Sequence, residues 1–274
     1  MSSHCVGGGR VEPIYRNSNV AIYQGDVLIV LPQLAPASVN AVIADPPYCS
    51  GATNPANRTR QSPRRKYNIS SHVAQDLPDF DGDQRDQRSF TYWSTLWLTE
   101  CHRVTTPGGA LMVFTDWRQL PSITDAIQAA GWVWRGIIAW HKPAARVQMG
   151  RFTNSCEYIA WASKGSLPRT QQSPLPGMYS HSAPHHSKRI HITEKPVPLL
   201  RKITIIVPHS SVILDPFCGS GSTGTAALLE GHRFIGIELS RHYAQQAATR
   251  LDTTQHGQNP PDQSHAVIPK ADQP

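Results

Sequence analysis

The chain is 274 residues long, which is enough for one large α/β domain or two small domains, and 39% of its residues are hydrophobic. Its formal net charge of +7 suits a polyanionic partner, although charge alone is weak evidence for one. Five scattered cysteines without a CxxC pair argue against a disulfide framework or a zinc site, and no apolar stretch or signal-peptide core indicates a membrane. We therefore expect a cytoplasmic protein that binds neither a metal nor a membrane.

Before residue 90 the pattern predicts two short strands, a turn and helix between them, and one long loop. After a flexible leader (1–12), the predicted elements are the strand Val20–Tyr23, a turn and helix over Asp26–Leu34, and the strand Val39–Ala44. The second strand is a run of β-branched and small residues, typical of a parallel strand buried on both faces. Pro46 and Pro47 prevent it from continuing. Residues 49–88 are polar without periodicity, which predicts a mobile loop.

Strands and helices alternate through the rest of the chain. The predicted elements are the helix Phe90–Val104, the strand Ala110–Thr115, the helix Leu120–Ala130, the antiparallel strands Val133–Trp140 and Tyr158–Ala162, the helix Val197–Val207, the strand Val212–Leu214, the helix Thr223–Glu230, the strand Phe234–Glu238 and the helix Arg241–Arg250. We expect Pro107-Gly108-Gly109 to break the chain and residues 163–190 to be irregular. The alternation predicts one doubly wound, Rossmann-like α/β domain over residues 13–251, with helices on both faces of the sheet and a disordered tail at 252–274.

Basic residues concentrate in two segments. Residues 49–75 hold five basic residues and no acid, and residues 141–190 hold seven against the single acid Glu157. Two such segments on a mildly acidic body suggest a surface that contacts phosphates, and solubilising loop charge is the alternative. The candidate DNA-binding residues are Arg58, Arg60, Arg64, Arg65, Lys66, Lys142, Arg146, Arg151, Lys188 and Arg189.

A glycine-rich turn follows the strand that ends near Leu214. In Phe217-Cys218-Gly219-Ser220-Gly221 the glycines permit a tight turn and close approach of a ligand to backbone N–H groups. About twenty residues later Glu238 ends the next strand, where an acid accepts hydrogen bonds from the ribose hydroxyls of a nucleoside cofactor. By itself this spacing also fits NAD, or a plain turn between a strand and a helix.

The tetrapeptide Asp45-Pro46-Pro47-Tyr48 narrows the choice, because it matches the pattern (D/N/S)PP(Y/F/W). Together with the FxGxG turn it resembles the DNA amino-methyltransferases, which transfer a methyl group from S-adenosylmethionine to an exocyclic amine. The resemblance implies a methyltransferase sheet in which the Asp45 carboxylate and the Pro46 carbonyl accept hydrogen bonds from the amine. The prolines would hold that carbonyl rigidly, and Tyr48 would stack on a flipped base. Cys49 needs no role, because amine methylation forms no covalent enzyme intermediate.

The order of the motifs, DPPY before FxGxG, resembles the permuted beta class of these enzymes over about residues 15–250. Gly25-Asp26 looks like the contact to the cofactor's adenine, and the segment 191–196 looks like the H-x-T-E-K-P motif that helps to hold its methionine end. Cys218 and Ser220 occupy variable positions of the turn, and only Ser220 is counted with the cofactor site. The cofactor-binding residues implied by the resemblance are Asp26, Asp45, Thr193, Lys195, Asp215, Phe217, Gly219, Ser220, Gly221 and Glu238.

The resemblance also implies double-stranded DNA as substrate, a small target-recognition region at residues 141–190, and a homodimer. The loop after Tyr48 is most similar to solitary phage and prophage enzymes. Asp45 favours adenine N6 as the target, and cytosine N4 is the alternative because it uses the same amine chemistry. Cytosine-C5 methylation is disfavoured, because the chain has no Pro-Cys dipeptide. A catalytically silent DNA-binding protein and an NAD-dependent oxidoreductase are the alternatives from other classes.

Overall fold

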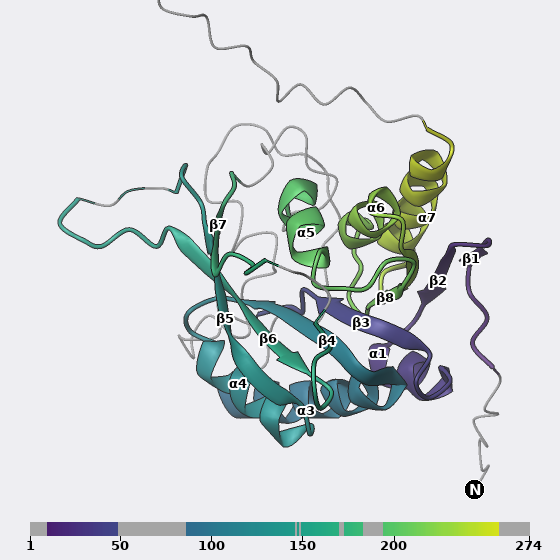
Figure 1. Ribbon diagram of the computed structural model, residues 1–274, viewed down its shortest axis with the longest axis horizontal. Coiled ribbons are helices and arrows are strands. Elements are labelled where there is room, and N and C mark those ends of the chain that lie inside the picture. Colours follow the sequence, from purple (N-terminus) through teal and green to yellow (C-terminus); the bar gives the residue numbers. More distant parts are fainter. Residues whose placement is uncertain are drawn as a thin grey trace, which may run out of the picture.

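A computed structural model describes residues 10–48, 86–145, 147, 149–169, 173–182 and 194–257. Its strands form one nine-stranded sheet of order β1-β2-β9-β8-β3-β4-β6-β5-β7 (Figure 1). The strands are β1 (Tyr15–Arg16), β2 (Val20–Gln24), β3 (Val39–Ala44), β4 (Thr105–Thr115), β5 (Val133–His141), β6 (Cys156–Ser163), β7 (Met178–Ser180), β8 (Val212–Asp215) and β9 (Arg233–Glu238). The five consecutive strands from β2 to β4 in this order are mutually parallel.

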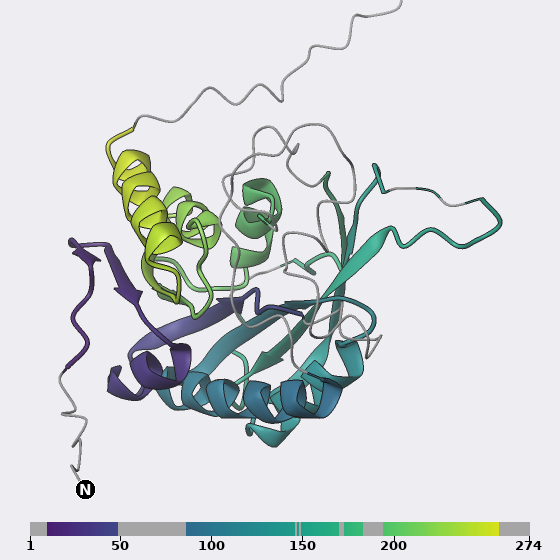
Figure 2. The same cartoon turned by 180° about the vertical axis from the view of Figure 1, so that it is seen from behind.

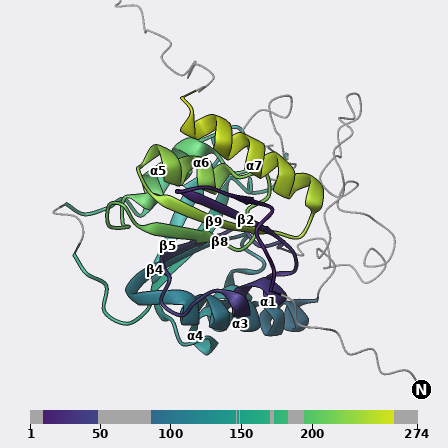
Figure 3. The same cartoon turned by 90° about the vertical axis from the view of Figure 1, so that its right-hand side faces the viewer.

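Helices cover both faces of the sheet, as the sequence predicts. The helices are α1 (Val27–Val30), the 3-10 turn η1 (Leu31–Gln33), α3 (Gln87–Val104), α4 (Leu120–Ala129), α5 (Val197–Thr204), α6 (Ser222–Leu229) and α7 (Arg241–Gln255). The first group, α1, α3 and α4, lies on one face, and α5, α6 and α7 lie on the other (Figure 3). Figure 2 shows α3 running beneath the sheet on the first face. The Rossmann-like fold class is therefore confirmed.

Strand β3 lies at the centre of the sheet and divides two hydrophobic cores. Val42 and Ala44 belong to the core beneath α3 and α4, which also holds Trp97. Ala41 and Ile43 point to the opposite core, beneath α5, α6 and α7. Successive side chains of a strand face opposite sides, so this strand must be apolar at nearly every position. The predicted burial of the strand on both faces is confirmed.

The parallel strands bring three acidic side chains to one edge of the sheet. Asp45 follows the last residue of β3, Asp215 ends the adjacent strand β8, and Glu238 ends β9 beyond it. Carboxyl ends of parallel strands meet at a common edge, which is where open α/β sheets bind ligands. The order of the strands thus joins residues from opposite ends of the chain.

The turn residues Pro107-Gly108-Gly109 lie inside β4, so the prediction that they break the chain is wrong. They shift the register instead: Val39 of β3 pairs with Thr105, whereas Ala41 pairs with Ala110. Gly108 has a φ of 77°, and a Cβ on Gly109 would lie 2.3 Å from Cγ2 of Thr105. The segment therefore forms a bulge that only glycine can occupy without displacing its neighbours.

Several boundaries differ from those predicted. Strand β7 lies in residues 163–190, which were predicted to be irregular, and pairs with β5. Helix α7 continues to Gln255, so the first residues of the predicted tail are helical. Helix α3 begins at Gln87, inside the predicted loop 49–88, because Asp86 accepts a hydrogen bond from the Ser89 backbone N–H and caps the helix. No helix among the described residues is both long and apolar enough to span a membrane.

Candidate active site at the carboxyl edge of the sheet

The DPPY segment and the predicted cofactor lysine meet directly beyond β3. Lys195 lies with its Nζ 2.6 Å from Oδ2 of Asp45, although the two residues are 150 positions apart. The Tyr48 hydroxyl donates a hydrogen bond of 2.8 Å to the other oxygen, Oδ1. Pro46 is buried and Pro47 is half-buried, and their fixed φ angles restrict the backbone that directly follows Asp45. The structure therefore joins two motifs that the sequence could only list separately.

Glu157, at the second position of β6, completes this cluster. Its Oε2 lies 3.3 Å from the Tyr48 hydroxyl and 3.7 Å from Nζ of Lys195. Its Oε1 accepts a hydrogen bond of 2.8 Å from Lys142. In the sequence, Glu157 stands out only as the lone acid of a basic segment, and no motif assigns it a role. That isolation, next to the predicted strand Tyr158–Ala162, was the available signal for a paired acid.

Burial and pairing set the protonation states of the cluster. Burial raises the pKa of Asp45 above its usual value, and the Lys195 ammonium opposes this effect. Burial also acts to raise the pKa of Glu157, but Lys195 and Lys142 together outweigh it and lower the pKa. The pKa of Tyr48 lies well above 10, because of its burial and the negative charges of Asp45 and Glu157. Tyr48 is thus a neutral donor between two carboxyl groups.

The glycine-rich turn adjoins the cluster at the end of β8. Gly219 and Gly221 have φ values of 50° and 86°, in the left-handed region that favours glycine. Oε2 of Glu238 accepts a hydrogen bond of 2.9 Å from the Gly219 N–H, and Oε1 accepts one of 2.8 Å from Ser240. Glu238 therefore shapes the turn, and each of its oxygens keeps a lone pair for a further donor.

Asp215 supports the same turn from the inside. One of its oxygens accepts a hydrogen bond of 2.9 Å from the Phe217 N–H. Burial raises its pKa to about 7; the hydrogen bonds from Thr223 and Phe217 act against this, and the charges of Asp45 and Glu238 add to it. Three carboxyl groups at one edge repel one another and favour a positively charged ligand. A ligand with a sulfonium and an ammonium group fits this electrostatic environment.

Other predicted cofactor contacts lie around this turn. Gly25 donates its N–H to the backbone oxygen of Glu238 at 3.0 Å, so the Gly25-Asp26 pair adjoins the acid at the end of β9. Asp26 caps α1 through a hydrogen bond of 2.8 Å from the Leu28 N–H, and its side chain is exposed. The Phe217 ring packs on Trp97 of α3 with a centroid distance of 5.1 Å, which fixes the turn to that helix.

Glu194, next to Lys195, links this segment to helices α6 and α7 beside the glycine-rich turn. Its Oε1 accepts hydrogen bonds of 2.8 Å from Arg250 of α7 and 3.1 Å from Ser222 at the start of α6. Ser220 in the turn is buried, and its backbone oxygen lies 3.5 Å from the same arginine. Glu194 has no predicted role of its own, yet its hydrogen bonds connect the segment that carries Lys195 to the glycine-rich turn.

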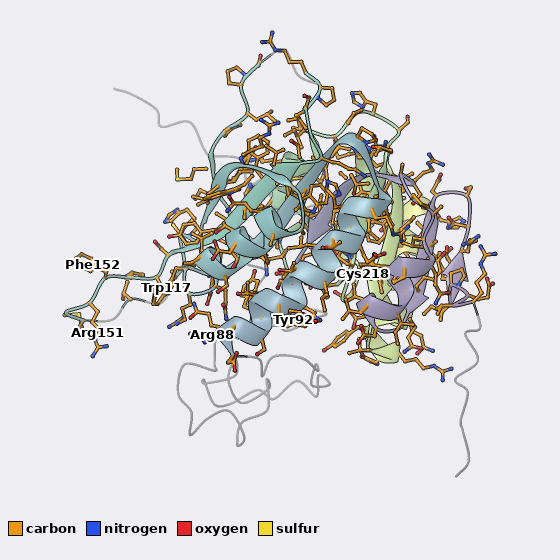
Figure 4. All side chains as sticks on the ribbon, turned by 90° about the horizontal axis from the view of Figure 1, so that it is seen from below. Arg88, Tyr92, Trp117, Arg151, Phe152 and Cys218 are labelled. Carbon is orange, nitrogen blue, oxygen red and sulfur yellow. The ribbon has the colours of Figure 1, made fainter. Side chains whose placement is uncertain are left out.

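The predicted DNA contacts are placed only in part. Lys142 pairs with Glu157, so its charge belongs to the buried cluster as well as to the basic segment. Arg151 lies at the end of the β5–β6 connection, which projects from the body of the molecule (Figures 1 and 4). The remaining DNA-binding candidates lie outside the described residues, namely Arg58, Arg60, Arg64, Arg65, Lys66, Arg146, Lys188 and Arg189. The predicted cofactor contact Thr193 also lies outside them. Among the described residues, no group of three or more His, Cys, Asp or Glu side chains could hold a metal ion.

This fold and site define a class: a doubly wound parallel sheet with an acid–proline motif beyond the central strand and a glycine-rich turn beside it. Residues 39–249 match the N6/N4 methyltransferase family, described as DNA methylase. The chain therefore belongs to this family of DNA methylases.

Individual proteins show the same likeness over most of the chain. M2.LlaDCHI of Lactococcus lactis subsp. cremoris, named as a type II methyltransferase, is 26% identical over 259 residues, covering 88% of this chain and 92% of that protein. The fold resembles the M1.HpyAVI complex with S-adenosylmethionine (TM-score 0.60, 24% identity, 85% of this chain and 99% of that one). It also resembles the cytosine-N4-specific PvuII DNA methyltransferase (TM-score 0.67, 16% identity, 90% of this chain and 96% of that one).

Proposed function

We propose that the protein transfers a methyl group from S-adenosylmethionine to adenine N6 in double-stranded DNA, by base flipping and direct transfer. One observation carries the proposal: Asp45, Tyr48 and Lys195 form a paired cluster beside the glycine-rich turn that Asp215 and Glu238 support. S-adenosylmethionine supplies an electrophilic methyl group on a sulfonium, and the three acidic side chains suit its positive charge. The intact cluster argues against a catalytically silent DNA-binding protein.

The chemistry required of the chain is to make an amine nucleophilic. The lone pair of an exocyclic amine is delocalised into the ring, so acceptors on both N–H bonds are needed to localise it on nitrogen. Asp45 and the Pro46 carbonyl would provide these acceptors, already fixed in place before the base arrives. The amine nitrogen then forms a bond to the methyl carbon as the bond from that carbon to sulfur breaks. The surplus proton on nitrogen leaves through Asp45, whose raised pKa suits this step.

The cofactor contacts are proposed on the same basis. Lys195 and Thr193 would hold the methionine end, Asp26 would contact the adenine, and Glu238 would accept the ribose hydroxyls. The turn around Gly219 would lie against the cofactor through its backbone. The described members of this set lie along the carboxyl edge between β2 and β3, which supports one continuous binding site.

Adenine N6 is proposed as the target because Asp stands first in the DPPY motif. Cytosine N4 is the competing target, since the family includes both and the fold resembles a cytosine-N4 enzyme. The motif order supports the permuted beta class. Residues 49–88 and 141–190 are proposed as the DNA-contacting regions, and a homodimer, present in the cytoplasm, is proposed to address palindromic sites.

Expression in a host that lacks DNA methylation, followed by single-molecule sequencing of its genome, tests the function directly. The expected result is N6-methyladenine at one recurring sequence, and none in cells that express Asp45→Asn. Detection of N4-methylcytosine instead would show that cytosine, and not adenine, is the target base. An unmodified genome from cells with abundant folded protein would contradict the proposed function.

A further inference from the structure

Both oxygens of the catalytic carboxylate already have strong donors. Oδ2 of Asp45 faces Nζ of Lys195 at 2.6 Å, and Oδ1 accepts from the Tyr48 hydroxyl at 2.8 Å. A carboxylate that is engaged by an ammonium and a hydroxyl is a poorer acceptor for a third donor. The amine of a flipped base therefore competes with these two side chains for Asp45. If they simply lost Asp45, a buried ammonium would be left unpaired, which is costly.

Glu157 offers the two displaced donors a second acceptor. Its Oε2 lies 3.3 Å from the Tyr48 hydroxyl and 3.7 Å from Nζ of Lys195, so both donors already lie between the two carboxylates. Lys195 is only 8% exposed in its side chain and has little access to water as a replacement partner. Shifts towards Glu157 of roughly 0.5 Å for the Tyr48 hydroxyl and roughly 0.8 Å for the Lys195 ammonium would bring both contacts to ordinary hydrogen-bond lengths.

Lys142 keeps Glu157 ready for this role. It pairs with the opposite oxygen, Oε1, at 2.8 Å and leaves Oε2 directed at Tyr48 and Lys195. The pairing of β5 with β6 fixes this geometry, because Trp140 lies opposite Glu157 and the Lys142 N–H donates to the Ser155 oxygen at 2.7 Å. Glu157 is therefore held as an ionised acceptor by the sheet itself.

We infer that Glu157 is a positioning residue that takes over the hydrogen bonds of Lys195 and Tyr48 when the target amine occupies Asp45. The inference rests on the proposed function and extends it to a residue outside the sequence motifs. Glu157 need not touch the base or the cofactor. Its contribution is to free the acceptor oxygens of Asp45 without leaving a buried charge unpaired.

The experiment compares Glu157→Gln with the wild type, using tritiated S-adenosylmethionine and genomic DNA from a methylation-free host. The substitution keeps the shape of the side chain and removes its charge. We expect kcat to fall by about 10- to 100-fold, as when a residue that orients a metal ligand is lost, while the Kd of S-adenosylmethionine changes by less than about threefold. Glu230→Gln is the matched control. Glu230 directly follows α6, at the end of that helix away from the glycine-rich turn, and forms an ion pair of 2.6 Å with Arg201 of α5. It should leave kcat unchanged.

The pH profile separates positioning from general damage to the fold. Asp45 is surrounded by Lys195, Tyr48 and Glu157, with Lys142 behind Glu157 and Asp215 at the end of the neighbouring strand β8. The charge of Glu157 helps to raise the pKa of Asp45. The acidic limb of kcat should therefore move to lower pH in Glu157→Gln. The inference would be overturned if Glu157→Gln kept the kcat and the pH profile of the wild type. It would also be overturned if only the affinity for S-adenosylmethionine fell, or if Glu230→Gln lost as much kcat. An inactive wild type would instead overturn the proposed function, and the inference with it.

Discussion

The carboxyl edge of the sheet and the β5–β6 connection lie next to each other but differ in the burial and pairing of their side chains. At the edge, Lys195 is 8% exposed and forms ion pairs with Asp45 and Glu157. In the connection, Phe152 and Met149 are essentially fully exposed, and Figure 4 shows Phe152 beside Arg151 at its far end. One region has a fixed, paired geometry, whereas the other presents large side chains to solvent.

The two regions are joined through Lys142, which follows β5 and pairs with Glu157. A rigid sheet commonly holds catalytic groups while its loops carry the contacts that select the partner. Substitutions at the edge should therefore alter chemistry or stability, whereas substitutions in the connection should alter DNA binding alone. The following predictions test this division, from the largest expected effect to the smallest.

Asp45→Asn should lower kcat by about 10³-fold, because it removes the charge that localises the lone pair of the amine. The Kd of S-adenosylmethionine should change only a few-fold, since the carboxylate mainly contacts the target. Equilibrium binding and turnover are to be measured on one preparation. Substantial turnover in the folded variant would place the catalytic acceptor elsewhere.

Asp215→Asn should remove a pH-dependent contribution of a few kcal/mol from the free energy of unfolding. Because burial raises the pKa of Asp215 from 3.8 to about 7, the folded protein holds a proton in this range that the unfolded chain has lost. The group therefore contributes stability at low pH that declines as pH rises from about 4 to 7. The free energy of unfolding of the variant should lack this decline. Above about pH 7 it should be larger than that of the wild type, as measured by urea unfolding. If the free energies of unfolding of the two proteins differed by the same amount at every pH, the raised pKa of Asp215 would be contradicted.

Glu238→Ala should weaken cofactor binding by about 1–3 kcal/mol, the range for a hydrogen bond to a charged group. The same change removes the acceptor of the Gly219 and Ser240 N–H groups, so calorimetric titration must be paired with thermal unfolding. Unchanged affinity in a folded variant would move the ribose contact to another residue.

Phe152→Ser should weaken DNA binding by about 1 kcal/mol, the lower end of the range for an aromatic side chain that stacks on bases. Its free energy of unfolding should change by less than about 0.5 kcal/mol, because the exposed ring makes little contact with the core. Ile29→Ser, an exposed position on α1, is the matched control for fluorescence anisotropy titrations. An unstable Phe152 variant would show that the connection packs against the body.

Arg151→Ala should reduce the slope of log K against log salt for DNA binding by about 0.9, the value for one phosphate contact. Replacement of Arg64, Arg65 and Lys66 together should reduce it by up to about 3, with little change in discrimination between sites. If Arg151 instead reaches a guanine edge, site discrimination will relax. Unchanged slope and affinity in the triple variant would exclude the basic segment after Tyr48 from the DNA interface.

The sequence predicted the elements and motifs better than their contacts. Periodicity and turn residues found the central strand and both ligand motifs, because these signals are local. The pairing of Asp45 with Lys195 depends on a strand order that no local signal contains. Glu157 was missed for the same reason, since its role arises from the pairing of β5 with β6. The bulge at Gly109 was misjudged because glycine and proline signal a break without saying whether pairing resumes.

The central position of β3 has a consequence for the newly made chain. The side chain of Asn40 accepts a hydrogen bond from the Val212 N–H, 172 residues further along the chain. At roughly 5–20 residues per second, synthesis of β8 follows that of β3 by about 10 to 35 seconds, and the side of β3 that pairs with β8 is unpaired during this interval. An apolar strand with an unpaired edge is a site of aggregation during that interval. The yield of folded protein should therefore rise when chaperones are co-expressed.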